Sequence, residues 1–332
     1  MHELWEAVQK NNLALVNKLL DDGEYDLKIP FEETGYTMLQ TACVHNLVEM
    51  TRLLLDRGAN VNEKNEEDGT PLLLAGSTGC LDIARLLLER GANVDDYDED
   101  GTTALQHACY SERLEVVRLL LDHNANLEIA DSEELTPLHL SCTNGNVEIT
   151  RRLLDRGANI EARTAQNLTA LHLAFQKGQL RIAQLLLDRH ADVDAKQMNG
   201  LTQLHVACRD SRIHVVKMLL DRDADVEVRD DEECTPLHHA CRSGLSPTIV
   251  DLLLNQGANP NAQQATKRTP LHDVCMSGFS EAGQILLDRG ADVNVVTNEG
   301  MTPLHVACQH DRPELVWLLL HRHPLLIFGL RG

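Results

Sequence analysis

The stretch TPLHLSC at residues 136–142 decides the fold of this chain, because it recurs along the sequence at nearly constant spacing. TPLHHAC follows at 235–241, TPLHDVC at 269–275 and TPLHVAC at 302–308. With looser copies included, nine phrases begin at Thr37, Thr70, Thr103, Thr136, Thr169, Thr202, Thr235, Thr269 and Thr302. Seven of the eight intervals are 33 residues and one is 34, so one unit is repeated nine times, from repeat 1 (Thr37) to repeat 9 (Thr302).

Each repeat predicts a pair of short helices. The Thr hydroxyl can cap the first helix, and the Pro that often follows fits the first helical turn. A second, Leu-rich helix ends at Gly-Ala, as in LLLDRGA at 53–59, where the glycine can adopt the left-handed conformation. In four repeats another residue replaces this glycine, namely Asn124, His190, Asp223 and His323. Asn, Asp and His are the non-glycine residue types that tolerate positive φ best. The polar stretch before each Thr is predicted to form an exposed finger loop.

A fixed period of 33 residues with T-P-L-H is typical of ankyrin repeats, and the chain resembles an ankyrin array over nearly its whole length. The resemblance implies an all-α solenoid of stacked helix–turn–helix units with β-hairpin-like finger loops. Residues 1–30 align as an N-terminal capping repeat, giving about ten layers. We predict a single domain over 1–323, followed by an apolar tail over 324–332. Repeats start at about residues 31, 64, 97, 130, 163, 196, 229, 263 and 296.

Composition excludes several classes of protein. No run of 18 apolar residues and no basic-then-apolar leader is present, so we expect no membrane span and a cytoplasmic or nuclear monomer. A net charge of −21 disfavours nucleic acid as a partner, because binding to phosphates requires many Lys and Arg residues. Phosphate-loop and catalytic motifs are absent from the sequence, so we expect neither an enzyme nor a cofactor.

The cysteines and histidines are interpreted as structural. Seven cysteines lie six residues after a repeat Thr, at a layer spacing of roughly 10 Å that is too wide for disulfides. Cys80 and Cys234 fall outside this pattern, and we expect them to be more exposed. The resemblance implies that the TPLH histidines hydrogen-bond between neighbouring loops. Repeats 1–3 carry Gln40, Leu73 and Gln106 at that position, which predicts less tightly linked layers that open first in hydrogen exchange. A ladder of histidines does not converge on one ion, so no metal site is predicted.

The resemblance implies that partner proteins bind the finger loops and the inner helices. At these positions the N-terminal repeats carry Glu66, Glu67, Asp68, Asp98, Glu99, Asp100, Asp131, Glu133 and Glu134. Phe31, Tyr36, Tyr97 and Tyr110 fall at the same variable positions. Acids beside exposed aromatic rings suit a Lys- or Arg-rich segment, through ion pairs and cation–π contacts. The alternative is a solvated acidic face that only keeps the array in solution.

The position fifteen residues after the repeat Thr forms a second column on the outer helices. It holds Arg52, Arg85, Arg118, Arg151 and Lys217, which we expect to be neutralised by Asp-Arg pairs such as Asp56-Arg57. Repeat 9 has Trp317 in this column, followed by the apolar residues of the tail. Three explanations stay open: the tail covers Trp317, the chain is truncated or alternatively ended, or a partner docks on Trp317.

The sequence therefore favours a non-enzymatic scaffold that binds a partner protein on its concave face and finger loops. One alternative is a substrate-recognition subunit of a ubiquitin ligase, although the C-terminal box of such subunits is not found in HPLLIFGLRG. A second alternative is the ankyrin segment of a larger channel or signalling protein.

Overall fold

The computed structural model describes residues 2–23, 25–31 and 34–322, and the described residues form helices and loops without a named strand. The chain divides into two compact units, Met1–Ala165 with Thr169–Leu186, and Gln166–Leu168 with Leu187–Gly332. The single domain over 1–323 stays a prediction. The expectation that the tail covers Trp317 concerns residues outside the described part of the chain.

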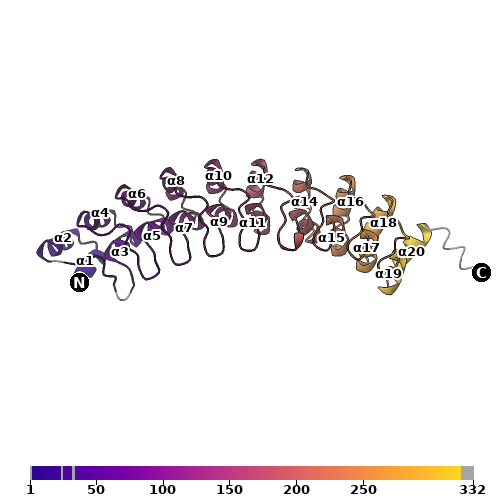
Figure 1. Ribbon diagram of the computed structural model, residues 1–332, viewed down its shortest axis with the longest axis horizontal. Coiled ribbons are helices and arrows are strands. Elements are labelled where there is room, and N and C mark those ends of the chain that lie inside the picture. The colour runs from indigo at the N-terminus through magenta and orange to yellow at the C-terminus, as the bar shows by residue number, and fades with distance from the viewer. Residues whose placement is uncertain (1, 24, 32–33, 323–332) are drawn as a thin grey trace, which may run out of the picture. The chain divides into compact units, whose positions relative to one another are not determined.

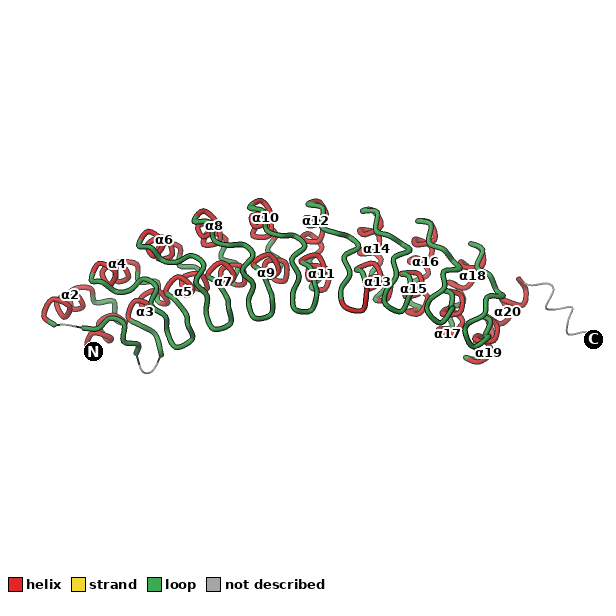
Figure 2. The backbone as a smooth tube through the Cα atoms, viewed as in Figure 1, coloured by secondary structure: helices red, strands yellow, loops and turns green. Residues whose placement is uncertain are grey.

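The first unit contains α1 (His2–Gln9), α2 (Leu13–Asp22), α3 (Met38–Val44), α4 (Val48–Asp56), α5 (Pro71–Thr78), α6 (Leu81–Glu89), α7 (Ala104–Tyr110), α8 (Leu114–Asp122), α9 (Pro137–Asn144), α10 (Val147–Asp155), α11 (Ala170–Gln176) and most of α12 (Leu180–Asp188). Helices α3, α5, α7, α9 and α11 form an inner row, and α2, α4, α6, α8 and α10 form an outer row (Figure 1). The finger loops project side by side beyond the inner row (Figure 2).

The second unit repeats this two-row arrangement. It contains the 3₁₀ turn η1 (Met198–Gly200), α13 (Gln203–Arg209), α14 (Ile213–Leu220), α15 (Pro236–Ser243), α16 (Pro247–Asn255), α17 (Pro270–Ser277), α18 (Ser280–Asp288), α19 (Pro303–Gln309) and α20 (Pro313–Arg322). Inner helices pack on inner helices, as α13 does on α15, and outer helices pack on outer helices. Among the described residues, none of these helices has the length and hydropathy that a membrane span needs.

Local residue chemistry accounts for where the helices begin and end. All nine repeat threonines are the N-cap residues of inner helices, which confirms the predicted helix starts. Asn124, His190 and Asp223 adopt φ values of 57°, 65° and 59°, as their replacement of the turn glycine predicts. His323 lies outside the described residues. Leu, Ala and Cys side chains fill the layers, where they are shielded from water.

The cysteine ladder is buried as expected, except for Cys308 in the last repeat. The expectation for the two cysteines outside the ladder was wrong, because Cys80 and Cys234 are buried as well. Cys80 is the N-cap residue of α6, and its Sγ lies 3.2 Å from the Thr78 hydroxyl. Cys234 closes the base of a finger loop, and its Sγ lies 2.8 Å from the Gln264 side-chain oxygen. All nine cysteines are free thiols.

The TPLH histidines link neighbouring repeats as the resemblance implied. Nδ1 of His205 accepts the Thr202 N–H at 3.1 Å, and its Nε2 donates to the Cys234 carbonyl of the next repeat at 3.0 Å. His238 and His272 make equivalent bonds to Arg268 and Met301, whereas Nε2 of His139 donates to the carbonyl of Ala162, at an earlier position of the loop.

Repeats 1 and 3, which we predicted to be less tightly linked, make this link through glutamine, and their order of opening in hydrogen exchange stays a prediction. Gln40 accepts the Thr37 N–H at 2.8 Å and donates to the Gly69 carbonyl at 2.7 Å. Gln106 accepts the Thr103 N–H at 2.9 Å and donates to the Leu135 carbonyl at 2.7 Å. A primary amide offers both an acceptor and a donor, so Gln replaces the neutral imidazole at this position. Leu73 in repeat 2 has neither group.

Ion pairs between successive outer helices form a ladder in each unit. Arg57 pairs with Asp21 at 2.8 Å, Arg90 with Asp56 at 2.8 Å, and Arg222 with Asp188 at 2.7 Å. In these three pairs the Asp-Arg dipeptides connect adjacent repeats and do not contact the basic column that we expected them to neutralise. The column residues Arg52, Arg118 and Arg151 pair instead with Glu49, Glu115 and Glu148 on their own helices. A spacing of three residues puts both side chains on one helix face, which explains this preference.

Candidate protein-binding face

The finger loops of repeats 2–4 in the first unit carry most of the predicted partner-binding acids. Seven of the nine side chains are exposed, namely Glu66, Glu67, Asp68, Glu99, Asp100, Glu133 and Glu134. Backbone hydrogen bonds join each finger to the next, from Glu99 N to Glu67 O at 3.3 Å and from Ser132 N to Asp100 O at 2.8 Å. These bonds hold carboxylates of successive repeats side by side, and we call this surface the acidic finger face.

The other two predicted acids have a different role. Asp98 Oδ1 accepts the backbone N–H groups of Asp100 and Thr102, at 3.2 and 2.8 Å. Asp131 Oδ1 accepts those of Glu133 and Leu135, at 3.0 and 2.9 Å. A carboxylate that satisfies two loop amides fixes the finger in one conformation. Asp98 and Asp131 therefore position the acidic finger face.

The aromatic side chains are less available than the sequence suggested. The Lys64 ammonium lies 5.5 Å from the centroid of the Tyr97 ring and 3.5 Å from the Asp68 carboxylate. Phe31 packs on Trp5 of the capping repeat, with ring centroids 4.9 Å apart. Tyr36 is half-buried, whereas Tyr110 is 66% exposed on α7. Tyr110 is thus an open aromatic contact of the first unit, whereas Tyr97, which is 55% exposed, already holds a cation of the chain itself.

Trp317 belongs to the second unit, on α20. Its side chain is 61% exposed, and its ring lies 3.9 Å from the ring of His321. The structure therefore does not combine Trp317 with the acidic fingers into one site within a unit.

A small pocket opens between the fingers and inner helices of repeats 2 and 3. Its volume is about 140 Å³. His107 on α7 donates from Nε2 to Asp98 Oδ2 at 2.7 Å, which ties the finger of repeat 3 to its inner helix. The carboxylates that line the pocket are Glu67, Asp98, Glu99 and Asp100, and its other walls include Leu73, Leu74 and Ser77.

The second unit contains an equivalent pocket between repeats 6 and 7, with a volume of about 810 Å³. His239 donates to Asp230 at 2.8 Å, and both residues lie 132 positions after His107 and Asp98. The Ser77 position is occupied by Arg209, and Arg242 also lines this pocket. Two copies of one Asp–His pair therefore sit beside pockets of different charge. This pairing was not predicted from the sequence, although the spacing of nine residues between Asp and His occurs in both repeats.

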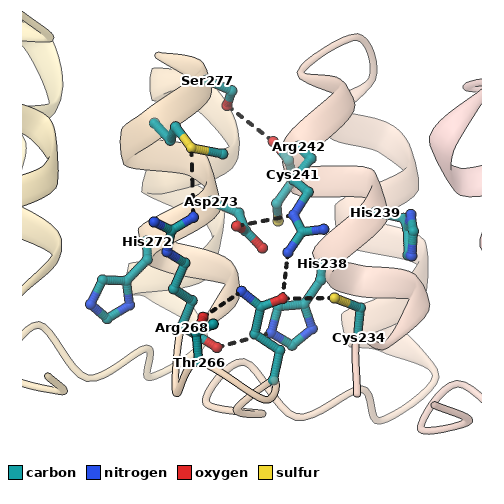
Figure 3. Close-up of polar contacts among 12 residues, drawn as sticks. Cys234, His238, His239, Cys241, Arg242, Thr266, Arg268, His272, Asp273 and Ser277 are labelled. Carbon is teal, nitrogen blue, oxygen red and sulfur yellow. Dashed lines mark hydrogen bonds and ion pairs between the residues drawn. The ribbon is translucent and has the colours of Figure 1, made fainter. Parts of the chain in front are cut away.

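Arg242 is held in place by a buried carboxylate (Figure 3). Its Nε donates to Asp273 Oδ1 at 3.2 Å, and its Nη2 hydrogen-bonds to the side-chain oxygen of Gln264. Asp273 has no exposed surface, and burial raises the pKa of its carboxyl to about 6 despite the opposing charge of Arg242. Burial likewise raises the pKa of the neighbouring Cys234 thiol to about 11. The network cross-links α15, α17 and two fingers.

One group among the described residues has the composition of a metal site: His205, Asp230 and His239. The candidate ligand atoms all lie within 4.8 Å of one another. Thr202 N–H donates to Nδ1 of His205, so the ring proton is on Nε2, where it is donated to Cys234 O. A metal ion bound at Nε2 would displace that proton. Nδ1 could then no longer accept the Thr202 N–H, because the neutral ring would have to carry its proton at Nδ1. The cluster is therefore explained by structural hydrogen bonds, which do not suit a metal ligand set.

Comparison with known proteins covers nearly the whole chain. A family model described as ankyrin repeats (three copies) matches residues 4–98, 65–131, 90–164, 125–197, 171–264 and 237–325. No curated protein matches the chain significantly.

Proposed function

The chain belongs to the ankyrin-repeat family, whose repeats are generally protein–protein interaction modules, and we propose that it is a non-enzymatic scaffold for a partner protein. The partner contributes a segment rich in Lys or Arg, which the acidic finger face binds. The proposal rests on the row of seven exposed carboxylates on three consecutive fingers, which are linked by backbone hydrogen bonds.

Physical reasons favour binding over a merely solvated acidic face. Carboxylates fixed in neighbouring loops repel one another, and a basic segment would remove this repulsion on binding. The loops are already ordered by Asp98 and Asp131, so little conformational entropy is lost when the partner docks. Lys64 on Tyr97 and Asp68 is an internal example of the same ammonium–aromatic–carboxylate contact.

The chemistry of the nucleophilic groups supports a non-enzymatic role. Burial raises the pKa of the Cys142 and Cys275 thiols to about 12, which leaves them as unreactive thiols at neutral pH. The TPLH imidazoles of repeats 4, 6, 7 and 8 are engaged at both nitrogens in structural hydrogen bonds.

Charge reversal on the acidic finger face tests the proposal. The variant Glu66→Lys with Glu99→Lys keeps Asp98 and the finger conformation, and the control Asp82→Lys with Glu89→Lys makes the same charge change on exposed positions of α6. The probe is a short labelled peptide of alternating Lys and Ser, followed by fluorescence anisotropy and stopped flow. We expect the finger variant to weaken binding about tenfold, mainly through slower association, and the control to have a smaller effect. Equal effects of both variants would show that binding depends only on the net charge of the chain, and the acidic finger face would be rejected as the binding site.

A further inference from the structure

We propose that the pocket between repeats 2 and 3 is an anchor site for a single long cationic side chain, Lys or Arg, of the partner. This inference rests on the proposed function and deepens it, because it names the residue type that the acidic finger face selects. Its lining includes three exposed acids, Glu67, Glu99 and Asp100, which we call its mouth, and the less exposed Leu73, Leu74 and Ser77, which we call its walls.

The volume and the lining of the pocket fit this occupant. A cavity of about 140 Å³ has room for roughly five water molecules at about 30 Å³ each, comparable to an ammonium or guanidinium group with part of its stem. The apolar walls of Leu73 and Leu74 suit the methylene groups of such a stem. The carboxylates at the mouth suit its charged end, since charge-assisted hydrogen bonds are stronger than neutral ones.

The base of the pocket is already organised. Asp98 is held by two loop amides and by His107, so the carboxylate cannot turn away from the pocket without breaking three hydrogen bonds. The mouth is also fixed, because Glu99 N donates to the carbonyl of Glu67 across the two fingers. Preorganised acceptors favour a cation that can donate to several of them at once.

The equivalent pocket of the second unit is lined by two arginines of the chain itself, Arg209 and Arg242. Asp230, Asp231 and Glu232 correspond to Asp98, Glu99 and Asp100 in their repeats, and His239 corresponds to His107. There, Arg209 lines the pocket where the first unit has Ser77. Arg209 pairs with Asp210, and Arg242 lies 3.8 Å from Glu232. The first unit has Ser77 and Tyr110 at these two positions, so its pocket is lined by the same kind of acids without either arginine. This difference indicates that the pocket with Ser77 receives its cation from outside.

The substitution Ser77→Arg copies the second unit and is the central test. The new guanidinium would lie among Glu67, Asp98 and Glu99 and would compete with an incoming cation. The matched control is Ser77→Gln, since Gln176 occupies the same position in repeat 5. Both replacements remove the Ser77 Oγ bond to the Leu74 carbonyl, so a difference between them reports the charge.

Amide-resolved NMR on the full chain measures the site directly. The probes are Nα-acetyl-lysine N-methylamide, the matching arginine compound and the uncharged norleucine analogue. We expect saturable shifts at Gly69, Ser77 and His107 with the lysine or arginine compound, binding about tenfold or more weaker with norleucine, and loss of the shifts in Ser77→Arg but not in Ser77→Gln. The stronger of the two cationic probes identifies which side chain the pocket takes.

Failure of this inference is distinguishable from failure of the proposed function. If the Lys-Ser peptide binds the acidic finger face but neither amino-acid probe shifts the three reporter amides, the anchor site is rejected and the function stands. Equal affinity of the peptide for Ser77→Arg and Ser77→Gln would also reject the anchor site. If the lysine or arginine probe binds while charge reversal at Glu66 and Glu99 leaves peptide affinity unchanged, the pocket stands and the wider surface is wrong.

Discussion

At the scale of single residues, the least usual side chain is the fully buried Asp273. One of its carboxylate oxygens accepts from Arg242, and the other has no hydrogen-bond partner among the described residues. Most repeats have an apolar residue at this position, as in Leu140 and Val306. A buried ion pair thus stands in a column that is apolar in most repeats, and its members should be strongly coupled.

A double-mutant cycle measures that coupling. Arg242→Met alone should cost about 3–5 kcal/mol of unfolding free energy, because the buried carboxylate loses its counter-charge. Combining it with Asp273→Val should recover most of the loss. Met276 and Val306 already occupy these positions one repeat later, so the residues fit the fold. Urea unfolding of the three variants gives the values, and additive losses would contradict strong coupling.

A second residue-scale prediction concerns the missing link of repeat 2. Leu73→Gln should stabilise the chain by about 1 kcal/mol, because Gln at this position can accept the Thr70 N–H and donate to the Thr102 carbonyl, as Gln40 and Gln106 do in their repeats. Hydrogen exchange of the repeat 3 finger should slow. The adjacent Leu74→Gln is the control, and equal stabilisation by both variants would show that the gain does not come from this hydrogen bond.

At the scale of the elements, the inner helices are joined by neutral imidazoles. Burial lowers the pKa of His205 and His238 to about 4, and it also lowers the pKa of His139 and His272. Protonation at Nδ1 would break the bond from the Thr N–H, so the folded state favours the neutral ring. The second unit has more of these histidines than the first, in which repeats 1–3 use Gln or Leu.

Acid should therefore loosen the second unit first. Between about pH 6.5 and pH 4, histidines of the unfolded chain bind protons, whereas those of the folded chain stay neutral. The free energy of unfolding therefore falls as pH is lowered, by up to roughly 3 kcal/mol for His205 or His238. Asp273, whose pKa is raised to about 6, acts in the opposite direction over part of this range. Hydrogen exchange at pH 7 and pH 5, corrected for intrinsic rates, should show a larger loss of protection in α13, α15 and α17 than in α3, α5 and α7. A uniform loss would contradict the prediction.

At the scale of the whole molecule, 51 acidic and 30 basic residues produce strong self-repulsion. Salt screens repulsion between finger carboxylates, and it also weakens the ion-pair ladder of the outer helices. The excess of acids makes the first effect the larger one. Stability should therefore rise with salt while affinity for a basic segment falls.

Opposite salt responses of stability and binding are the prediction at this scale. Increasing ionic strength from about 0.01 M to about 0.1 M shortens the screening length from about 30 Å to about 10 Å. The midpoint temperature of thermal unfolding should increase over this range. The Kd for the Lys-Ser peptide should also increase, because its affinity falls. A midpoint that falls with salt would show that the ladder of ion pairs outweighs the repulsion, and an unchanged Kd would contradict charge-driven binding.

The sequence by itself determined the repeat boundaries, the N-cap threonines and the residues that tolerate positive φ at Asn124, His190 and Asp223. These features depend on a few neighbouring residues and on the 33-residue period, so they can be inferred from local chemistry. The acidity of the finger loops was equally visible, because charge is a property of composition.

Only the tertiary structure decided which partner each side chain contacts. Gln40 and Gln106 replace the histidine link, Lys64 covers Tyr97, and Asp98 supports a loop in place of facing a partner. The contacts of Gln40, Gln106 and Lys64 cross from one repeat to the next, so they depend on how neighbouring layers pack. The pocket between repeats 2 and 3 arises in the same way, because its volume is what remains after neighbouring layers have packed.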